Sequence, residues 1–151
     1  MNEDSLNKID DLINKSRTIL VSGHKNPDGD SMASSLAMAH FLKGLGKEVT
    51  VFSGDKLPYN YMFLENSSEI TSDLPQYDPD LFFIVDAGSV DRIESKLRKK
   101  ILAGEKPRVL FDHHVLTNSV KEFYTEIFVD EKACATAALI FRWAEKRGLN
   151  P

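Results

Sequence analysis

Residues 18–31 have the sequence Thr-Ile-Leu-Val-Ser-Gly-His-Lys-Asn-Pro-Asp-Gly-Asp-Ser, in which an apolar run leads into a cluster of polar side chains. The run Thr18–Val21 is typical of a buried β-strand, and the proline and glycines that follow it signal a tight turn. His24, Asp28 and Asp30 therefore lie just beyond the end of a strand. An open α/β sheet presents its ligand-binding residues at that position.

Two further polar clusters follow apolar runs in the same way. Asp86 comes directly after Leu-Phe-Phe-Ile-Val, and Asp112, His113 and His114 follow Val-Leu-Phe. Taken alone, each cluster also has a purely structural interpretation, such as an Asx turn, a helix cap or a pair of surface histidines. Three strands of one sheet, however, would deliver carboxylate or imidazole groups to the same edge. This combination favours a dinuclear metal site.

Apolar spacing predicts the other elements of the fold. We expect helices over residues 4–16, 30–45 and 133–147, a partly helical segment over 89–106, and strands over 18–21, 48–52, 81–85, 109–111 and 123–129. Because strands and helices alternate, the sequence predicts an α/β fold. Its sheet should be open, mainly parallel and five-stranded, with helices on both faces.

Composition limits the class of protein. A chain of 151 residues suits one domain, and a formal net charge of −4 gives no electrostatic reason to expect tight binding to duplex nucleic acid. The single cysteine, Cys134, excludes an internal disulfide, and we expect its thiol to be buried. We find neither a membrane-spanning apolar run nor a secretion signal, so we expect a cytoplasmic protein with no membrane partner.

The three clusters together resemble the motifs of the DHH phosphoesterase superfamily, which are H-x-x-P-D-x-D-S, V-D and D-H-H. That superfamily includes RecJ-type exonucleases, oligoribonucleases (nanoRNases) that also dephosphorylate 3′-phosphoadenosine 5′-phosphate, cyclic-dinucleotide phosphodiesterases and family II inorganic pyrophosphatases. The resemblance covers nearly the whole chain. It is closest to the nanoRNase branch at residues 47–52, 57–59, 63–64, 92–93 and 133–136.

The resemblance implies a set of metal ligands. His24, Asp28 and Asp86 would bind one ion. Asp30, Asp86 and His113 would bind a second ion, so that Asp86 bridges the pair. Manganese is the usual ion of the family, and we therefore expect two Mn²⁺ ions, with Mg²⁺ as the alternative.

The resemblance also implies the catalytic residues. His114 would face the substrate phosphate, and Asp112 would orient a neighbouring histidine. We expect hydrolysis of short single-stranded oligonucleotides or of 3′-phosphoadenosine 5′-phosphate, by in-line attack of an activated water on phosphorus. Two alternatives remain open. One is a family II-like inorganic pyrophosphatase, and the other is a non-catalytic module that binds metal or nucleotide.

Members of the superfamily carry a further aspartate ligand in a D-T-G-like segment, followed by a smaller domain that grips the substrate. Neither follows residues 133–147 in this chain. We therefore expect residues 1–151 to be an N-terminal DHH domain that stops before the last ligand and the C-terminal domain. A fragment, a natural truncation and a chain completed by a partner all fit this expectation, and so do a monomer and a homodimer.

Overall fold

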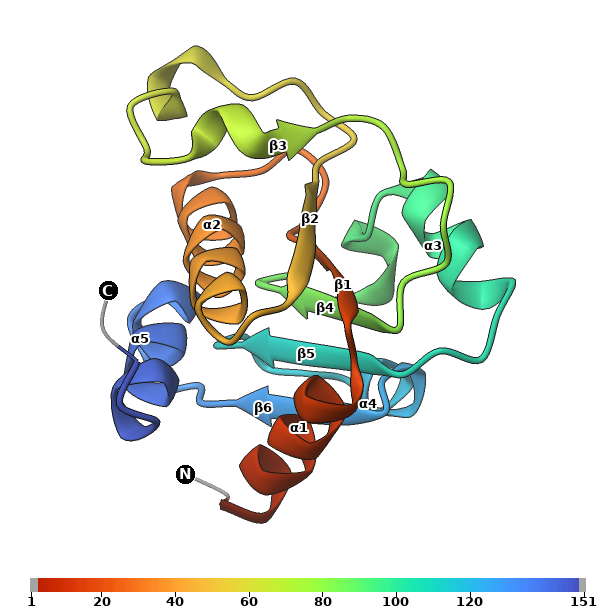
Figure 1. Ribbon diagram of the computed structural model, residues 1–151, viewed down its shortest axis with the longest axis vertical. Helices are drawn as coiled ribbons and strands as arrows, with labels where there is room; N and C mark the ends of the chain where they lie inside the picture. Colours follow the sequence, from red (N-terminus) through yellow and green to blue (C-terminus); the bar gives the residue numbers. More distant parts are fainter. Residues whose placement is uncertain (1–2, 150–151) are drawn as a thin grey trace.

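The computed structural model describes residues 3–149 and has an α/β architecture built on one parallel sheet (Figure 1). The sheet has six strands in the order β3-β2-β1-β4-β5-β6. In chain order these are β1 (Thr18–Ser22), β2 (Glu48–Phe52), β3 (Ile70–Thr71), β4 (Leu81–Val85), β5 (Arg108–Asp112) and β6 (Glu126–Val129). The predicted open parallel sheet is confirmed.

The predicted count of five strands is wrong, because the sheet gains β3 at its edge. This strand has two residues, which pair with Val51 and Phe52 of β2. A two-residue strand is too short to show the alternation of apolar and polar side chains by which strands are recognised.

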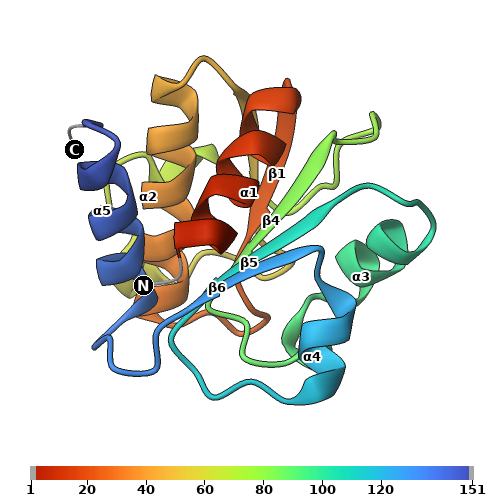
Figure 2. The same ribbon diagram turned by 90° about the horizontal axis from the view of Figure 1, so that it is seen from below.

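Helices cover both faces of the sheet, as predicted (Figure 2). Residues of three helices pack with one face, namely α1 (Glu3–Lys15), α2 (Gly29–Gly44) and α5 (Thr136–Lys146). The other face carries α3 (Ser95–Leu102) and α4 (Asn118–Phe123). Among the described residues, three short 3₁₀ turns lie in the connections: η1 (Tyr59–Tyr61), η2 (Ser67–Glu69) and η3 (Val90–Arg92).

The central strand β4 shows why the apolar runs of this sequence form buried strands. All five of its residues are buried. Phe83 belongs to the core under α1, α2 and α5, whereas Phe82 belongs to the core under α3 and α4. Successive side chains of a strand point to opposite faces, so a strand covered on both faces needs an unbroken apolar run.

Two predicted boundaries near the C-terminal end are wrong. The strand expected from residue 123 begins at Glu126 instead, because Phe123 is the last residue of helix α4. The last helix begins at Thr136 rather than at Ala133, because Ala135 is extended, with φ −162°. Cys134 therefore lies before the helix and is exposed, so the expectation of a buried thiol is also wrong.

The strand order reverses at β1, which pairs with β2 on one side and with β4 on the other. In open parallel sheets such a switch point leaves a crevice beyond the carboxyl ends of the strands, where ligands bind. The loops that follow β1, β4 and β5 carry the three predicted clusters to this edge.

Close packing between β1 and α2 fixes the first of these loops. Gly23 has no side chain, and a Cβ atom there would lie 2.0 Å from Ser31 Oγ and 3.2 Å from the Ser31 carbonyl oxygen. The buried Ser31 Oγ accepts a hydrogen bond of 3.0 Å from the His24 N–H. Glycine at position 23 therefore lets the loop turn tightly against the start of α2.

We predict that Gly23→Ala lowers the free energy of unfolding by about 1–3 kcal/mol through overpacking. Ser31→Ala should cost about 1 kcal/mol, because it removes one hydrogen bond. The double variant should cost less than the sum of the two, since the atom closest to the new methyl group is gone. Urea unfolding of the three variants measures this, and strictly additive costs would contradict the steric explanation.

Candidate metal centre

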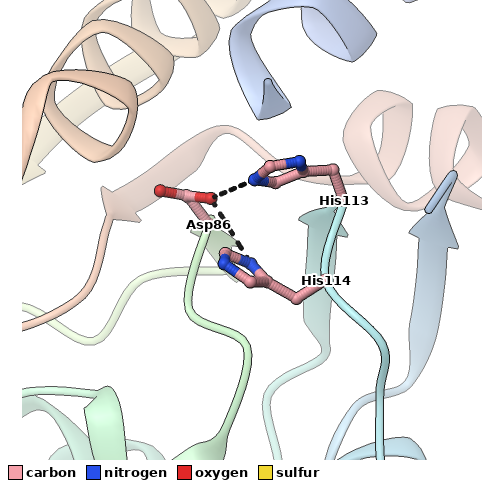
Figure 3. A group of neighbouring side chains, drawn as sticks. All are labelled: Asp86, His113 and His114. Atoms are coloured by element: carbon pink, nitrogen blue, oxygen red, sulfur yellow. Dashed lines mark ion pairs between the residues drawn. The ribbon is translucent and has the colours of Figure 1, made fainter. Parts of the chain in front are cut away.

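The loops beyond β1, β4 and β5 bring two histidines to opposite oxygens of one carboxylate. His24 Nε2 lies 3.8 Å from Asp86 Oδ2, and His113 Nε2 lies 3.6 Å from Asp86 Oδ1. Figure 3 shows Asp86, at the end of β4, facing His113 and His114 from the end of β5. A carboxylate that presents each oxygen to a different set of ligands is arranged as a bridging ligand would be.

The His24 ring is held in the tautomer that a metal requires. Its Nδ1 lies 2.7 Å from the Lys25 carbonyl oxygen, and because a carbonyl only accepts, Nδ1 carries the proton. The lone pair is therefore on Nε2, which is buried and has no hydrogen-bond partner within residues 3–149. Leaving a buried acceptor unpaired is costly. The arrangement fits an imidazole that ligates a metal.

Asp28 caps a helix with one carboxylate oxygen and lies near His24 with the other. Its Oδ1 accepts a hydrogen bond of 3.0 Å from the Ser31 N–H and caps α2, while its Oδ2 lies 3.7 Å from His24 Nε2. Some burial raises the pKa of Asp28, but the Ser31 N–H and the nearby His24 and Arg92 together hold this pKa below its ordinary value. The helix-cap and ligand interpretations of Asp28 are thus compatible.

Asp86 occupies a strained and desolvated position. Its backbone has φ +55°, in the left-handed region that few residues other than glycine adopt, and 2% of the residue is exposed. Burial, together with the negative charges of Asp30 and Asp112, raises the pKa of Asp86 to about 6, although Thr136 Oγ1 donates a hydrogen bond to it at 3.0 Å. A cation at this site would stabilise the charged form.

His113, like His24, is held by a backbone carbonyl, which in this case comes from a distant segment. Its Nδ1 lies 3.2 Å from the Ala133 carbonyl oxygen, so the Nε2 lone pair faces the site. Nε2 is 3.7 Å from Asp30 Oδ2, besides its contact with Asp86. The loop after β5 and the loop before α5 therefore act together to aim this ring.

The Asp30 carboxylate is shared between the site and the packing of the helices. Its oxygens accept hydrogen bonds from the backbone N–H groups of Thr136 (2.8 Å) and Ala137 (3.0 Å), at the start of α5. Ligand atoms that lie within 4.8 Å of one another form two groups among the described residues, His24–Asp28–Asp86 and Asp86–His113–His114. Asp30 is in neither group. Its role as a ligand of the second ion stays a prediction.

Asp112 orients His114 and joins two of the loops. It is fully buried, and its Oδ1 lies 2.6 Å from His114 Nδ1. The same oxygen accepts the backbone N–H groups of His113 and His114, and Oδ2 accepts the Gly88 N–H at 2.6 Å. With Nδ1 engaged by Asp112, Nε2 is the His114 nitrogen left for a substrate, and the side chain is 39% exposed.

The sequence patterns assigned no site role to Thr136, to Gly88 or to the carbonyls of Lys25 and Ala133. Three of these groups form hydrogen bonds with the candidate ligands Asp86, His24 and His113, and the Gly88 N–H donates to Asp112. Three of the four act through backbone atoms, which every residue type possesses, so no side-chain pattern identifies them. Thr136 gave one signal, a hydroxyl in a run of small residues at the start of a predicted helix.

Comparisons with known proteins show the family to which the chain is related. The DHH family, N-terminal domain, matches residues 18–150. None of the curated proteins is similar enough in sequence to count as a match.

Among solved structures, an exopolyphosphatase-related protein from Bacteroides fragilis has a TM-score of 0.83 and 21% identity, covering 97% of this chain and 44% of that protein. A RecJ exonuclease bound to manganese has a TM-score of 0.55 and 16% identity, and the match covers 98% of this chain and 38% of that protein. RecJ from Thermus thermophilus, in complex with Mn²⁺, has a TM-score of 0.54 and 18% identity, and the match covers 98% of this chain and 21% of that protein. The chain spans less than half the length of each of these proteins.

The raised pKa of Asp86 predicts an effect on the stability of the metal-free protein, which can be measured in the presence of a chelator. At pH 7, Asp86→Asn should be more stable than the wild type by about 2 kcal/mol, because the variant avoids a buried charge. Asparagine tolerates the left-handed backbone, so the substitution adds little strain.

The sign of the effect follows from the direction of the shift. A carboxyl group whose pKa is raised in the folded state stabilises the protein below its unfolded pKa of about 3.9, and this contribution is lost as pH rises through about 6. The advantage of the variant should therefore appear between these pH values, in urea unfolding measured with chelator. Equal stability of both proteins at pH 4 and at pH 7 would contradict the prediction.

Proposed function

The chain belongs to the DHH family, and on this basis we propose that it is the metal-binding part of a phosphoesterase. Its substrates would be short single-stranded oligonucleotides or nucleotide phosphates such as 3′-phosphoadenosine 5′-phosphate. The observation that carries the proposal is the buried Nε2 of His24, which has no hydrogen-bond partner in the described part of the chain and lies 3.8 Å from Asp86 Oδ2. Two Mn²⁺ ions are proposed, with Mg²⁺ as the alternative, and the manganese bound in the RecJ structures supports this choice.

The donor set fits hard divalent ions that accept both oxygen and imidazole ligands. His24 and Asp28 would hold one ion and His113 the other, with Asp86 shared and Asp30 beside the second. When bound, a pair of such ions polarises phosphate oxygens and lowers the pKa of a coordinated water. Before that, the protein must keep both imidazole lone pairs directed inward, which the backbone carbonyls beyond each ring achieve.

His114 is the residue best placed to contact the reacting phosphate. In its protonated form the ring donates from both nitrogens, and Asp112 accepts from Nδ1. Nε2–H is then available to a phosphate oxygen, where it would stabilise the negative charge that develops in the transition state. Asp112 is buried and holds the ring through a short hydrogen bond, so little reorganisation is needed during the reaction.

We also propose that the protein works in the cytoplasm. The exposed thiol of Cys134 supports this location, because a free surface cysteine remains reduced in a reducing compartment. None of the helices between residues 3 and 149 combines the length and apolar character needed to cross a bilayer.

We predict that Mn²⁺ raises the melting temperature. At a free concentration one hundred times its dissociation constant, the gain is about 2.7 kcal/mol, or roughly 5–10 °C for a domain of this size. His24→Ala should remove most of this rise. The matched control is His40→Ala, which changes an exposed histidine of α2 and should keep the full rise. Equal losses in the two variants, measured by calorimetry, would contradict the proposed site.

A second prediction separates metal binding from catalysis. In the full-length gene product, His114→Ala should keep its manganese but lose turnover by about a hundredfold, since it removes transition-state stabilisation. His113→Ala should lose one ion as well. The measurements are manganese stoichiometry and hydrolysis of a short RNA, of 3′-phosphoadenosine 5′-phosphate and of pyrophosphate.

Three results would change these assignments. Equal loss of metal in both variants would mean that the two histidines are wrongly assigned. Rapid pyrophosphate hydrolysis without nucleotide hydrolysis would replace the proposed substrate class by the pyrophosphatase alternative. Full manganese binding with no hydrolysis of any of the three substrates would favour the non-catalytic module.

A further inference from the structure

Arg92 differs from the other arginines of the chain in its surroundings. The chain has six arginines. Four form ion pairs, namely Arg17 with Glu48, Arg98 with Asp91, Arg142 with Asp130 and Arg147 with Asp10. A fifth, Arg108, has no side-chain hydrogen bond or ion pair within residues 3–149, but its guanidinium lies over the Phe123 ring. The Arg92 side chain is half-buried and takes part in none of the hydrogen bonds or ion pairs found within residues 3–149.

The Arg92 guanidinium lies beside the metal centre. A Cβ atom built on Gly88 would be 3.6 Å from Arg92 Nη1 and also 3.6 Å from His114 Nδ1. The cation and the imidazole thus flank the same point above the loop that follows β4. The backbone of Arg92 is hydrogen-bonded to Lys25 of the first loop and to Ser89 of the second, so Arg92 lies between these two loops.

The backbone of Arg92 is fixed by both of these loops. Its N–H donates to the Ser89 carbonyl at 3.1 Å, and its own carbonyl accepts the Lys25 N–H at 2.8 Å. These contacts place the residue at the end of the turn η3 and tie that turn to the loop carrying His24. A side chain on an anchored backbone loses less entropy when it binds a ligand.

The charges around the centre indicate that the Arg92 guanidinium is suited to an anionic ligand. Four carboxylates, Asp28, Asp30, Asp86 and Asp112, surround the centre, and two divalent ions would neutralise them. A phosphate that entered would then bring uncompensated negative charge. The Arg92 guanidinium and the His114 imidazole flank the space over Gly88. A guanidinium has the planar pair of donors that matches two phosphate oxygens.

We propose that Arg92 binds the reacting phosphate of the substrate, from the side of the site where the loops that follow β1 and β4 meet. This inference rests on the proposed function and adds a phosphate-binding residue to it. It assigns Arg92 to substrate binding rather than to metal binding, because no nitrogen of a charged guanidinium can ligate a cation.

The test uses adenosine 5′-monophosphate as the probe, titrated by calorimetry into the manganese-loaded chain. Arg92→Gln should weaken its binding about tenfold or more, as expected when a charge-assisted pair to phosphate is lost. Arg92→Lys should recover part of the affinity, because it restores the charge but not the planar fork. Both variants should keep the full manganese-induced rise in melting temperature.

Two controls accompany the titration. Arg98→Gln removes an arginine that is paired with Asp91 on the neighbouring segment, and it should bind the nucleotide as the wild type does. Adenosine, which lacks the phosphate, should show no difference between wild type and Arg92→Gln.

The outcomes separate this inference from the proposed function. Unchanged nucleotide affinity in Arg92→Gln, with manganese binding intact, overturns the inference alone. Loss of manganese binding in Arg92→Gln also overturns it, because the residue would then support the ligand loops. A manganese-loaded wild type that binds no nucleotide overturns it as well. Absence of manganese binding by the wild type overturns the proposed function and the inference together.

Discussion

The structure depends on keeping one carboxylate, Asp86, buried at the point where the strand order reverses. Its desolvation and its acidic neighbours raise its pKa to about 6, and its backbone is in the left-handed region. Neither feature stabilises the folded chain at neutral pH. The electrostatic cost would be offset by cations lying between the carboxylates, because the opposite charge compensates the burial. The candidate site is therefore destabilised by charge in a way that metal binding would relieve.

Hydrogen bonds behind the candidate ligands hold their side chains in place. The Lys25 carbonyl holds His24, the Ala133 carbonyl holds His113, and Asp112 holds His114. Each bond engages Nδ1, so the tautomer of each ring is fixed before any ligand arrives. The three rings come from two loops, and their supports add a third, the segment before α5. Displacing that segment would therefore disturb the His113 ring without touching a ligand.

Asp30 shows how packing and function share one side chain. Its carboxylate accepts the first N–H groups of α5, which is favourable at the positive end of a helix. The same oxygens lie near His113 and add to the negative field around Asp86. Residues far apart in the chain are thus coupled through one carboxylate, which links the docking of α5 on α2 to the electrostatics of the centre.

The linear sequence was enough to establish the α/β class, the parallel sheet and the strand-end positions of His24, Asp86 and His113. Unbroken apolar runs such as Leu81–Val85 can be buried on both faces only in a covered sheet, and parallel strands present their carboxyl ends at one edge. The sequence did not predict the two-residue β3, the helix α4 or the late start of α5, because these depend on pairing and packing with distant segments. The same holds for the left-handed Asp86, the carbonyl supports of the histidines and the free guanidinium of Arg92. These features arise where loops from three strands meet, and a local pattern of side chains does not encode which backbone atoms meet there.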